Sequence, residues 1–251
     1  MSSVQTQGFA RQILNWWRAN RGGNPFFVTL CRFLSGLWQF TVGSLPSRRR
    51  QRYGDVDFDW DHRVDTTSAT VKWRDRLLGE LHSPYQATDP TTFHEAIRAL
   101  PIDVGKFIFI DLGSGKGRAL LMAADYPFKR VVGVELLSSL HRVAIENLEK
   151  YKSASQKCFE MQSICADARE FVFPPDPTVL YLFNPLPEAG LVKVIDNLAN
   201  SLREKPRPVY VVYHHPLHGH VLARSPMLTK IAATDRYSIF ASQTQRPGCG
   251  V

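Results

Sequence analysis

A short glycine-rich stretch is the part of this sequence whose residue types point most directly to chemistry. Residues 107–118 read FIFIDLGSGKGR, in which an apolar run ends in an aspartate, three spaced glycines and an arginine. A strand that runs into a glycine turn brings backbone N–H groups close to a ligand, because glycine puts no side chain in the way. The nature of that ligand decides the chemistry.

Two phosphate-binding motifs are the first alternatives for this turn. A triphosphate loop requires GxxxxGK followed by serine or threonine, and here Lys116 is followed by Gly117, so that motif is absent. A dinucleotide fingerprint requires GxGxxG; Gly113 and Gly115 fit, but Arg118 occupies the third position. The turn alone leaves its ligand open, and the acidic residues around it have to discriminate.

Three carboxylates follow the predicted strands around the turn. Asp111 precedes the first glycine, Glu135 ends the next predicted strand, and Asp167 ends the third. We expect Glu135 to accept both hydroxyls of a ribose and Asp167 to accept a hydrogen bond from an adenine amino group. Three acids suit a ligand with an amine, a ribose and an adenine, and they repel a pyrophosphate. S-adenosylmethionine is such a ligand, because its cationic groups tolerate acids and its carboxylate can face the N–H groups of residues 115–117.

Alternating strand and helix patterns position these residues. The predicted strands cover 107–113, 130–135, 158–167, 178–185 and 209–216, followed by a terminal hairpin of 228–234 and 236–242. Helical patterns lie between them at 118–126, 138–151, 188–202 and 220–225. Several strands are apolar on both faces, which is typical of a parallel sheet covered by helices. The sequence therefore predicts an α/β fold: a doubly wound, mostly parallel, seven-stranded sheet with a terminal antiparallel hairpin and an N-terminal helical extension.

The segment before the sheet is predicted to combine loops and short helices. Residues 55–67 are acidic and turn-like, and residues 71–81 read as a short helix. Residues 84–90 contain two prolines and are expected to form an ordered loop. Asp89 is a good N-cap, and Pro90 suits the first position of the helix that follows.

The excess positive charge of the chain is confined to its N-terminal segment. The formal net charge is +8, and the first 54 residues contain eight arginines with no lysine and no acid. Of the 31 basic residues, 23 remain after these eight, and the 23 acidic residues balance them. A generally basic body is therefore not indicated. Charge and pattern divide the chain into a basic helical extension over 1–54, a cofactor-covering segment over 55–100, and the core over 101–251.

Residues 24–45 form an apolar stretch with a narrow polar stripe. The small or polar positions recur at spacings of three and four: Thr29, Arg32, Gly36, Gln39 and Gly43. An arginine near the middle of a spanning helix costs roughly 2.5 kcal/mol or more, so the stripe favours a helix that lies in a membrane interface or packs in a groove. Three alternatives remain open: a helical pair packed on the body, association with a membrane surface, and a cleaved targeting segment.

Two sets of residues resemble metal ligands, but neither has the spacing of a metal site. Cys31, Cys158, Cys165 and Cys249 form no CxxC pair, which favours a reducing compartment and a cytoplasmic location. Cys158 and Cys165 are expected on one strand. The run HHPLHGH at 214–220 contains four histidines but no carboxylate. No metal is expected; these histidines are predicted to lie at the rim or surface, and the alternative is that His214 or His215 accepts a proton.

With these motifs in order, residues 85–242 resemble the class I S-adenosylmethionine-dependent methyltransferases. DLGSGKGR is similar to their first motif, GVE to the acidic end of the second strand, CADA to the third and LFNP to the fourth. VDTT and PYQATDP before the turn, and YPFKRVVGVELLSSLH after it, resemble a bacterial group of uncharacterised methyltransferase-domain proteins. The order of a tyrosine-containing loop, DLGSG and an asparagine is more weakly similar to non-SET histone-lysine and membrane-anchored lysine methyltransferases.

The resemblance implies roles for individual residues. The residues that would line the methionine part of the cofactor are Asp111, Gly113, Ser114, Gly115 and Gly117. Glu135 would bind the ribose, and Asp167 with the Ala168 backbone would bind the adenine. The loop expected to close over the cofactor carries Tyr85, Thr88 and Asp89.

Asn184 and Tyr85 are the residues predicted to act on the methyl acceptor. The Asn184 side-chain carbonyl, and a backbone carbonyl freed beside Pro185, can accept hydrogen bonds from an incoming amine. The resemblance implies (D/N)-P-P-(Y/F) here in amino-group methyltransferases; this chain has NPLP, and Phe183 would substitute in part for the missing aromatic residue. The predicted acceptor is a protein lysine near a membrane. The alternatives are RNA, a small metabolite, or a non-catalytic cofactor-binding adaptor.

Overall fold

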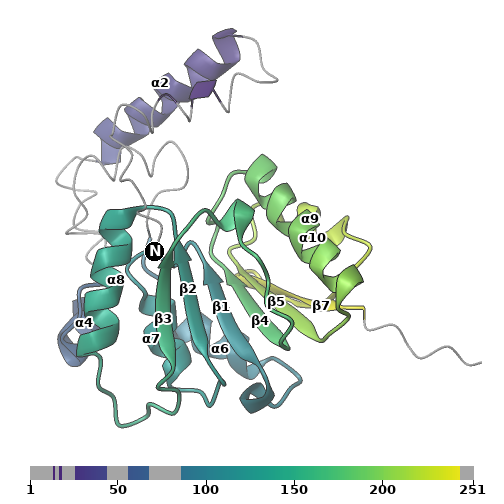
Figure 1. The fold of residues 1–251 in the computed structure, drawn as a ribbon. Helices are drawn as coiled ribbons and strands as arrows, with labels where there is room; N and C mark the ends of the chain where they lie inside the picture. The colour runs from purple at the N-terminus through teal and green to yellow at the C-terminus, as the bar shows by residue number, and fades with distance from the viewer. Residues whose placement is uncertain (1–13, 15–16, 19–25, 44–55, 68–85, 244–251) are drawn as a thin grey trace, which may run out of the picture.

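The computed structural model describes residues 14, 17–18, 26–43, 56–67 and 86–243. Within these residues seven strands form one sheet in the order β3-β2-β1-β4-β5-β7-β6 (Figure 1). The mutually parallel strands are β1 (Ile108–Leu112), β2 (Val131–Glu135), β3 (Met161–Cys165), β4 (Thr178–Leu182) and β5 (Val209–His214). Strand β7 (Tyr237–Ser242) runs antiparallel to both β5 and β6 (Leu228–Ala233). The fold class expected from the sequence is confirmed.

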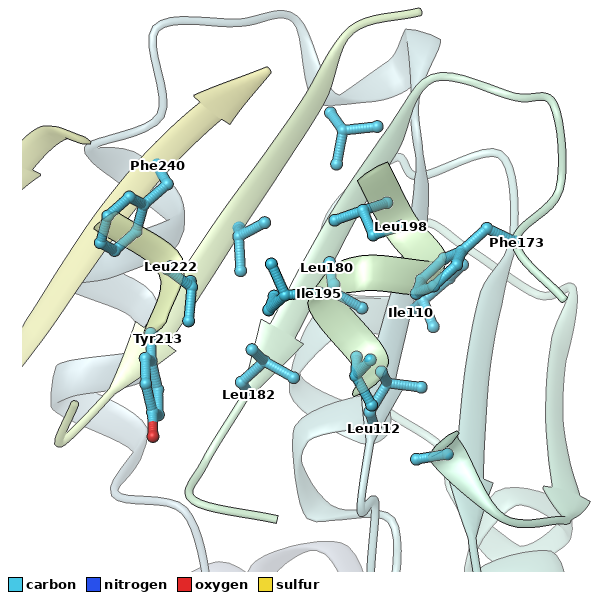
Figure 2. Packing of buried hydrophobic residues seen from close by; sticks show 14 of the residues in the cluster. Ile110, Leu112, Phe173, Leu180, Leu182, Ile195, Leu198, Tyr213, Leu222 and Phe240 are labelled. Carbon is cyan, nitrogen blue, oxygen red and sulfur yellow. The ribbon is translucent and has the colours of Figure 1, made fainter. Parts of the chain in front are cut away.

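Helices connect the parallel strands and cover both faces of the sheet. They are α6 (Pro90–Arg98), α7 (Arg118–Ala124), α8 (Ser138–Lys150), α9 (Glu188–Glu204) and α10 (Gly219–Ala223), with short 3₁₀ turns η2 (Val104–Lys106) and η3 (Ala168–Glu170). On one face, the apolar side chains of α9 and α10 pack on alternate residues of the central strands, as Leu180, Ile195 and Leu222 show in Figure 2. On the other face, α6 and α7 pack on the intervening residues, including Phe109 and Tyr181.

The apolar N-terminal stretch is helical, as the sequence predicts. Helix α2 (Phe26–Gly43) covers most of it, and Figure 1 shows this helix apart from the sheet. No helix among the described residues has both the length and the apolar character needed to cross a bilayer. Of the helix expected before Pro25, the structure describes Leu14, Trp17 and Arg18, which are helical.

Two local expectations are corrected. Residues expected to be turn-like form helix α4 (Val56–His62). Cys158 precedes β3, which begins at Met161, so Cys158 does not share a strand with Cys165. The helix expected over 71–81 lies outside the described residues, and the division of the chain near residues 54 and 100 stays a prediction.

The glycine turn packs directly on the loop that follows β4. Gly113 has φ +80°, and a Cβ atom there would lie 2.4 Å from the Cβ of Pro185. No side chain fits at this distance without displacing the neighbouring loop. The first glycine therefore allows the ends of β1 and β4 to meet, and it keeps Asn184 next to the turn.

We expect Gly113→Ala to lower the free energy of unfolding by about 3 kcal/mol, because a left-handed backbone and an overlap with Pro185 both disfavour alanine. Gly219→Ala is the matched control, since a Cβ there would lie at an ordinary 3.5 Å from the Cβ of Pro216. Urea unfolding followed by circular dichroism measures both variants. Equal stability of the two would contradict the close packing described here.

Candidate active site

Three acidic residues gather at the carboxyl edge of adjacent strands. Asp111 lies in β1, and Glu135 is the last residue of β2, its immediate neighbour. Asp167 does not end β3 as expected; that strand stops at Cys165, and Asp167 caps η3 two residues later. Since the three strands are parallel and adjacent, their carboxyl ends meet at one edge, where ligands of open α/β sheets bind.

The glycine turn between β1 and α7 has a backbone that only glycine adopts easily. Gly113, Gly115 and Gly117 have φ values of +80°, +55° and +86°. The Gly113 N–H donates to the Val134 carbonyl at 2.8 Å, and the Gly115 N–H donates to Oε2 of Glu135 at 2.8 Å. The turn is therefore fixed to the end of β2 at two points.

Glu135 is buried and its carboxylate is already hydrogen-bonded to the backbone. Oε2 accepts from Gly115, and Oε1 accepts from the Leu137 N–H at 2.8 Å. Burial raises the pKa of Glu135, while these backbone hydrogen bonds oppose the rise. Each oxygen retains a second lone pair, which is the capacity needed for a ribose hydroxyl. Ribose binding stays a prediction.

Asp111 is the most strongly perturbed carboxyl group of the edge. Its side chain is buried, and burial, followed by the nearby charge of Glu135, raises its pKa from 3.8 to about 8. Near neutral pH the free protein therefore holds Asp111 largely protonated. A cationic ligand group beside this residue would favour the ionised form, so Asp111 suits an ammonium and opposes an anion.

Ser114 provides a buried polar atom in the same turn. Its Oγ has no hydrogen-bond partner among the described residues, although the side chain is buried. The space for it exists because residue 133 on β2 is glycine: a Cβ there would lie 2.7 Å from this Oγ. A ligand in the turn would supply the missing partner, which fits a cofactor with polar groups at its methionine end.

Asp167 is engaged by its neighbour Arg169. Its Oδ1 accepts from the Arg169 N–H at 2.9 Å, and the guanidinium forms an ion pair with both carboxylate oxygens. The side-chain hydrogen bond to Asp167 raises the pKa of Arg169. Ala168 is buried beside it, at the first position of η3. Adenine binding by Asp167 and Ala168 stays a prediction, and it requires the carboxylate to accept an additional hydrogen bond.

Asn184 links the loops that follow β4 and β5. Its Nδ2 donates to the His215 carbonyl at 2.7 Å, and the Leu217 N–H approaches its Oδ1 at 3.4 Å. Both Asn184 and His215 have left-handed backbones, with φ values of +43° and +44°. Such conformations cost free energy outside glycine and concentrate at functional sites. The role of Asn184 toward an acceptor stays a prediction.

His214 is buried, so the expectation that the histidines lie at the rim or surface is wrong for this one; His215 and His220 are exposed. The Tyr181 hydroxyl lies 2.6 Å from Nδ1 of His214, and the imidazole ring stacks on Phe183 with centroids 4.4 Å apart. Burial, followed by the charge of His215, lowers the pKa of His214 to about 4. The imidazole is therefore neutral at physiological pH.

The predicted lid loop is described only from residue 86, so Tyr85 lies outside the described residues. Thr88 is buried and shares a side-chain hydrogen bond with Tyr181. Asp89 caps α6 by accepting from the Thr92 N–H at 2.8 Å, which confirms the predicted cap with Pro90 at the first helical position. Burial would raise the pKa of Asp89, but the hydrogen bonds from Thr92 outweigh it and lower the value.

Two kinds of contact were missed by sequence reasoning. One is the Tyr181–His214 pair, whose members lie 33 positions apart on neighbouring strands. The other is a set of ion pairs made by Lys116 and Arg118 with residues 59–67. The alternation of side chains between the two faces of β4 and β5 could have indicated the Tyr181–His214 pair. No local sequence pattern indicates the ion pairs of Lys116 and Arg118. No group of three or more metal-type ligands is found in the described part of the chain.

Comparison with known proteins returned solved structures only. No protein-family model and no curated protein matches the chain. A SAM-dependent O-methyltransferase from Thermotoga maritima is 18% identical, covers 65% of this chain and 69% of its own, and has a TM-score of 0.47. An RNA methyltransferase from Salinibacter ruber, in complex with S-adenosyl-L-homocysteine, is 18% identical and covers 65% and 97%, with a TM-score of 0.44.

TrmN from Thermus thermophilus is also similar, with 20% identity and a TM-score of 0.43. The match covers 61% of this chain and 48% of TrmN, so the chain spans about half the length of that protein. Similarity at these levels carries no argument about what the present chain binds or modifies. Function has to be inferred from the residues at the carboxyl edge of the sheet.

We expect Asp111→Asn to raise the free energy of unfolding by up to about 4 kcal/mol at pH 7, because the unfolded chain no longer gains from ionising this carboxyl. The folded pKa is about 8 and the ordinary value 3.8, so the gain should be absent below pH 4, grow between pH 4 and 8, and then level off. Urea unfolding at pH 5 and pH 8 measures it. Asp196→Asn, at an exposed position of α9, is the control; a gain no larger at pH 8 than at pH 5 would count against a buried neutral carboxyl.

Proposed function

We propose that this protein is an S-adenosylmethionine-dependent methyltransferase. The observation that carries the proposal is a turn of three left-handed glycines flanked by two buried carboxylates, Asp111 and Glu135. A phosphate-bearing nucleotide in that turn would be repelled by the Glu135 carboxylate and would oppose ionisation of Asp111. A ligand with an ammonium, a sulfonium and a ribose diol would instead satisfy both of them.

The turn and the strand ends supply a partner for each part of the cofactor. The Ser114 hydroxyl would bind its methionine carboxylate, and Asp111 its ammonium, because the N–H groups of Gly115 and Gly117 already donate to Glu135 and to the Ser114 carbonyl. Glu135 would bind the ribose, and Asp167 with Ala168 the adenine. Thr88, next to the cap of α6, would cover the site. The cofactor supplies a methyl group activated by sulfonium, and the protein has to align an acceptor with it and exclude water.

We propose further that the acceptor is an amine, with a protein lysine favoured. Pro185 contacts Gly113, so Asn184 is held beside the turn where the methyl donor would lie. The Leu217 N–H approaches the Asn184 Oδ1 at 3.4 Å, and an amide oxygen has two lone pairs, which gives it the capacity to accept a hydrogen bond from an amine N–H. An amine aligned in this way would present its lone pair to the methyl group. RNA is disfavoured because the basic and acidic residues after residue 54 balance.

Labelled S-adenosylmethionine tests the reaction and its acceptor together. We expect the purified protein, added to a lysate of the source cells, to transfer labelled methyl groups to polypeptides, and the product to be methyl-lysine. Asn184→Ala should reduce transfer at least about tenfold while cofactor binding by calorimetry is retained, because alignment is lost and the cofactor site is intact. Label found in RNA alone would overturn the lysine acceptor but not the methyltransferase. Absence of cofactor binding by a folded protein would overturn both.

We propose also that the N-terminal segment associates with an anionic membrane surface. Helix α2 exposes large apolar side chains, among them Phe27, which is 76% exposed, and Trp38, which is 70% exposed. The eight arginines of residues 1–54 complement anionic lipid headgroups. An arginine-rich segment with exposed aromatic residues is the composition of helices that lie in the interface.

Pelleting of the full-length protein with anionic vesicles tests this association. We expect Phe27→Glu to reduce the pelleted fraction several-fold, because it puts a charge of the wrong sign on the apolar face. Phe159→Glu is a matched control, since Phe159 is 77% exposed but lies on the core, before β3. Equal losses for the two variants, or equal pelleting of the wild type with neutral vesicles, would reject the proposal.

A further inference from the structure

A segment far away in the sequence is attached to the glycine turn through Lys116. We call residues 59–67 the strap. The Lys116 side chain is 1% exposed, and its Nζ donates to Oδ1 of Asp65 at 2.8 Å and to the Thr67 carbonyl at 2.7 Å. Lys116 lies between Gly115 and Gly117, so its side chain and two of the left-handed glycines belong to one continuous stretch.

Arg118, the first residue of α7, makes the second attachment. Its Nε donates to Oγ1 of Thr66 at 2.6 Å, and its Nη2 forms an ion pair with Oδ1 of Asp59 at 3.1 Å. The guanidinium lies 4.9 Å from the centroid of the Phe58 ring, a cation–π contact. Burial lowers the pKa of Arg118 to about 10, which leaves it charged at neutral pH.

The strap is stiffened by its own hydrogen bonds and by α8. Asp59 Oδ2 accepts from the N–H groups of Thr66 and Thr67 at 2.7 and 2.9 Å. Asn147 of α8 accepts from the Asp65 N–H at 2.9 Å and donates to the carbonyls of Asp65 and Lys116 at 2.8 and 2.9 Å. One buried amide thus fixes the strap and the main chain of the turn to each other.

Burying two cations is unfavourable unless partners replace the lost water. Asp65, Thr66, Thr67 and Asp59 are those partners for Lys116 and Arg118. If the strap leaves, the ammonium of Lys116 must reach water, and the short stretch from Gly115 to Gly117 has to move with it. Two glycines in three residues give that stretch many alternative conformations, so the strap selects among them.

We propose that the strap is part of the cofactor site, and that Lys116 and Arg118 are positioning residues whose ion pairs with Asp65 and Asp59 keep the turn in its ligand-binding conformation. This inference rests on the proposed function. In this proposal each cation acts through the backbone of the turn and not through contact with the cofactor. By linkage, a ligand in the turn must stabilise the docked strap by the same factor by which the strap strengthens ligand binding.

Calorimetric titration with S-adenosylhomocysteine measures the first half of this linkage. We expect Asp65→Asn in the full-length protein to bind at least about tenfold more weakly, because the charge-assisted bond to Lys116 is lost. Asp57→Asn is the matched control: Asp57 is an exposed acid of α4 that lies outside the strap, and this substitution should leave the affinity unchanged.

Hydrogen exchange on the wild-type protein measures the second half and does not depend on whether a variant folds. Saturation with S-adenosylhomocysteine should slow exchange of the Thr66 and Thr67 amides at least about tenfold, by the same linkage. The Thr234 amide, bonded to Tyr237 in the distant β6–β7 hairpin, should not change. A merely structural strap would show no such ligand-dependent protection.

The outcomes separate this inference from the proposed function. If the folded wild type does not bind S-adenosylhomocysteine, the proposed function fails and the inference falls with it. If the wild type binds, but Asp65→Asn binds equally well or the strap amides exchange at an unchanged rate, the inference alone is overturned.

Discussion

The carboxyl edge of the sheet is organised around the burial of two neighbouring carboxyl groups next to one glycine turn. Asp111 and Glu135 are both buried, and the charge of Glu135 contributes to the raised pKa of Asp111. Glu135 is compensated by the N–H groups of Gly115 and Leu137, whereas Asp111 is left largely neutral. Such an arrangement costs stability in the free protein, which makes it informative about the ligand that the turn binds.

The cations closest to these acids in the sequence are used elsewhere. Lys116 and Arg118 follow Asp111 by only a few residues, yet their ion-pair partners in the described structure are Asp65 and Asp59 of the strap. The turn therefore separates two sets of charged residues: Lys116 and Arg118, which form ion pairs with the strap, and the acids Asp111 and Glu135. A phosphate would need the cations on the ligand side, and a cationic cofactor needs the acids there. The same separation explains why the GKG sequence does not form a triphosphate loop.

Local sequence patterns predicted the features that local physics determines. The strands, the Asp89 cap and the position of Glu135 follow from apolar runs, capping preference and strand ends. Helix α4 was missed because VDFDWDH is acidic, which favours a turn, and its apolar residues alternate with acids instead of following a helical period. Its long-range contacts come from elsewhere in the chain: Asp59 pairs with Arg118, and the His62 ring stacks on Tyr151.

Long-range pairs lay beyond what the sequence could reveal. Lys116 contacts Asp65 over 51 positions, and Tyr181 meets His214 over 33. From the sequence alone, Lys116 and His214 are each compatible with several roles, because their partners become neighbours only in the folded protein. The sequence excludes a triphosphate loop at Lys116, but only the structure shows that its ammonium is used by Asp65 and Thr67.

The charges around His214 fit the amine acceptor that we propose. His214 is neutral at physiological pH because burial lowers its pKa, and the lowered pKa of Asp89 keeps that nearby carboxylate ionised. The charge of Arg236 contributes to lowering the pKa of both His214 and Asp89, and Arg236 itself forms an ion pair with Glu95. The local balance is therefore negative rather than positive, and it attracts an ammonium more readily than a nucleic-acid phosphate. An amine must lose its proton before it attacks, and in this proposal it releases that proton to water before the site closes; the neutral imidazole and the Asn184 carbonyl then suit the deprotonated form.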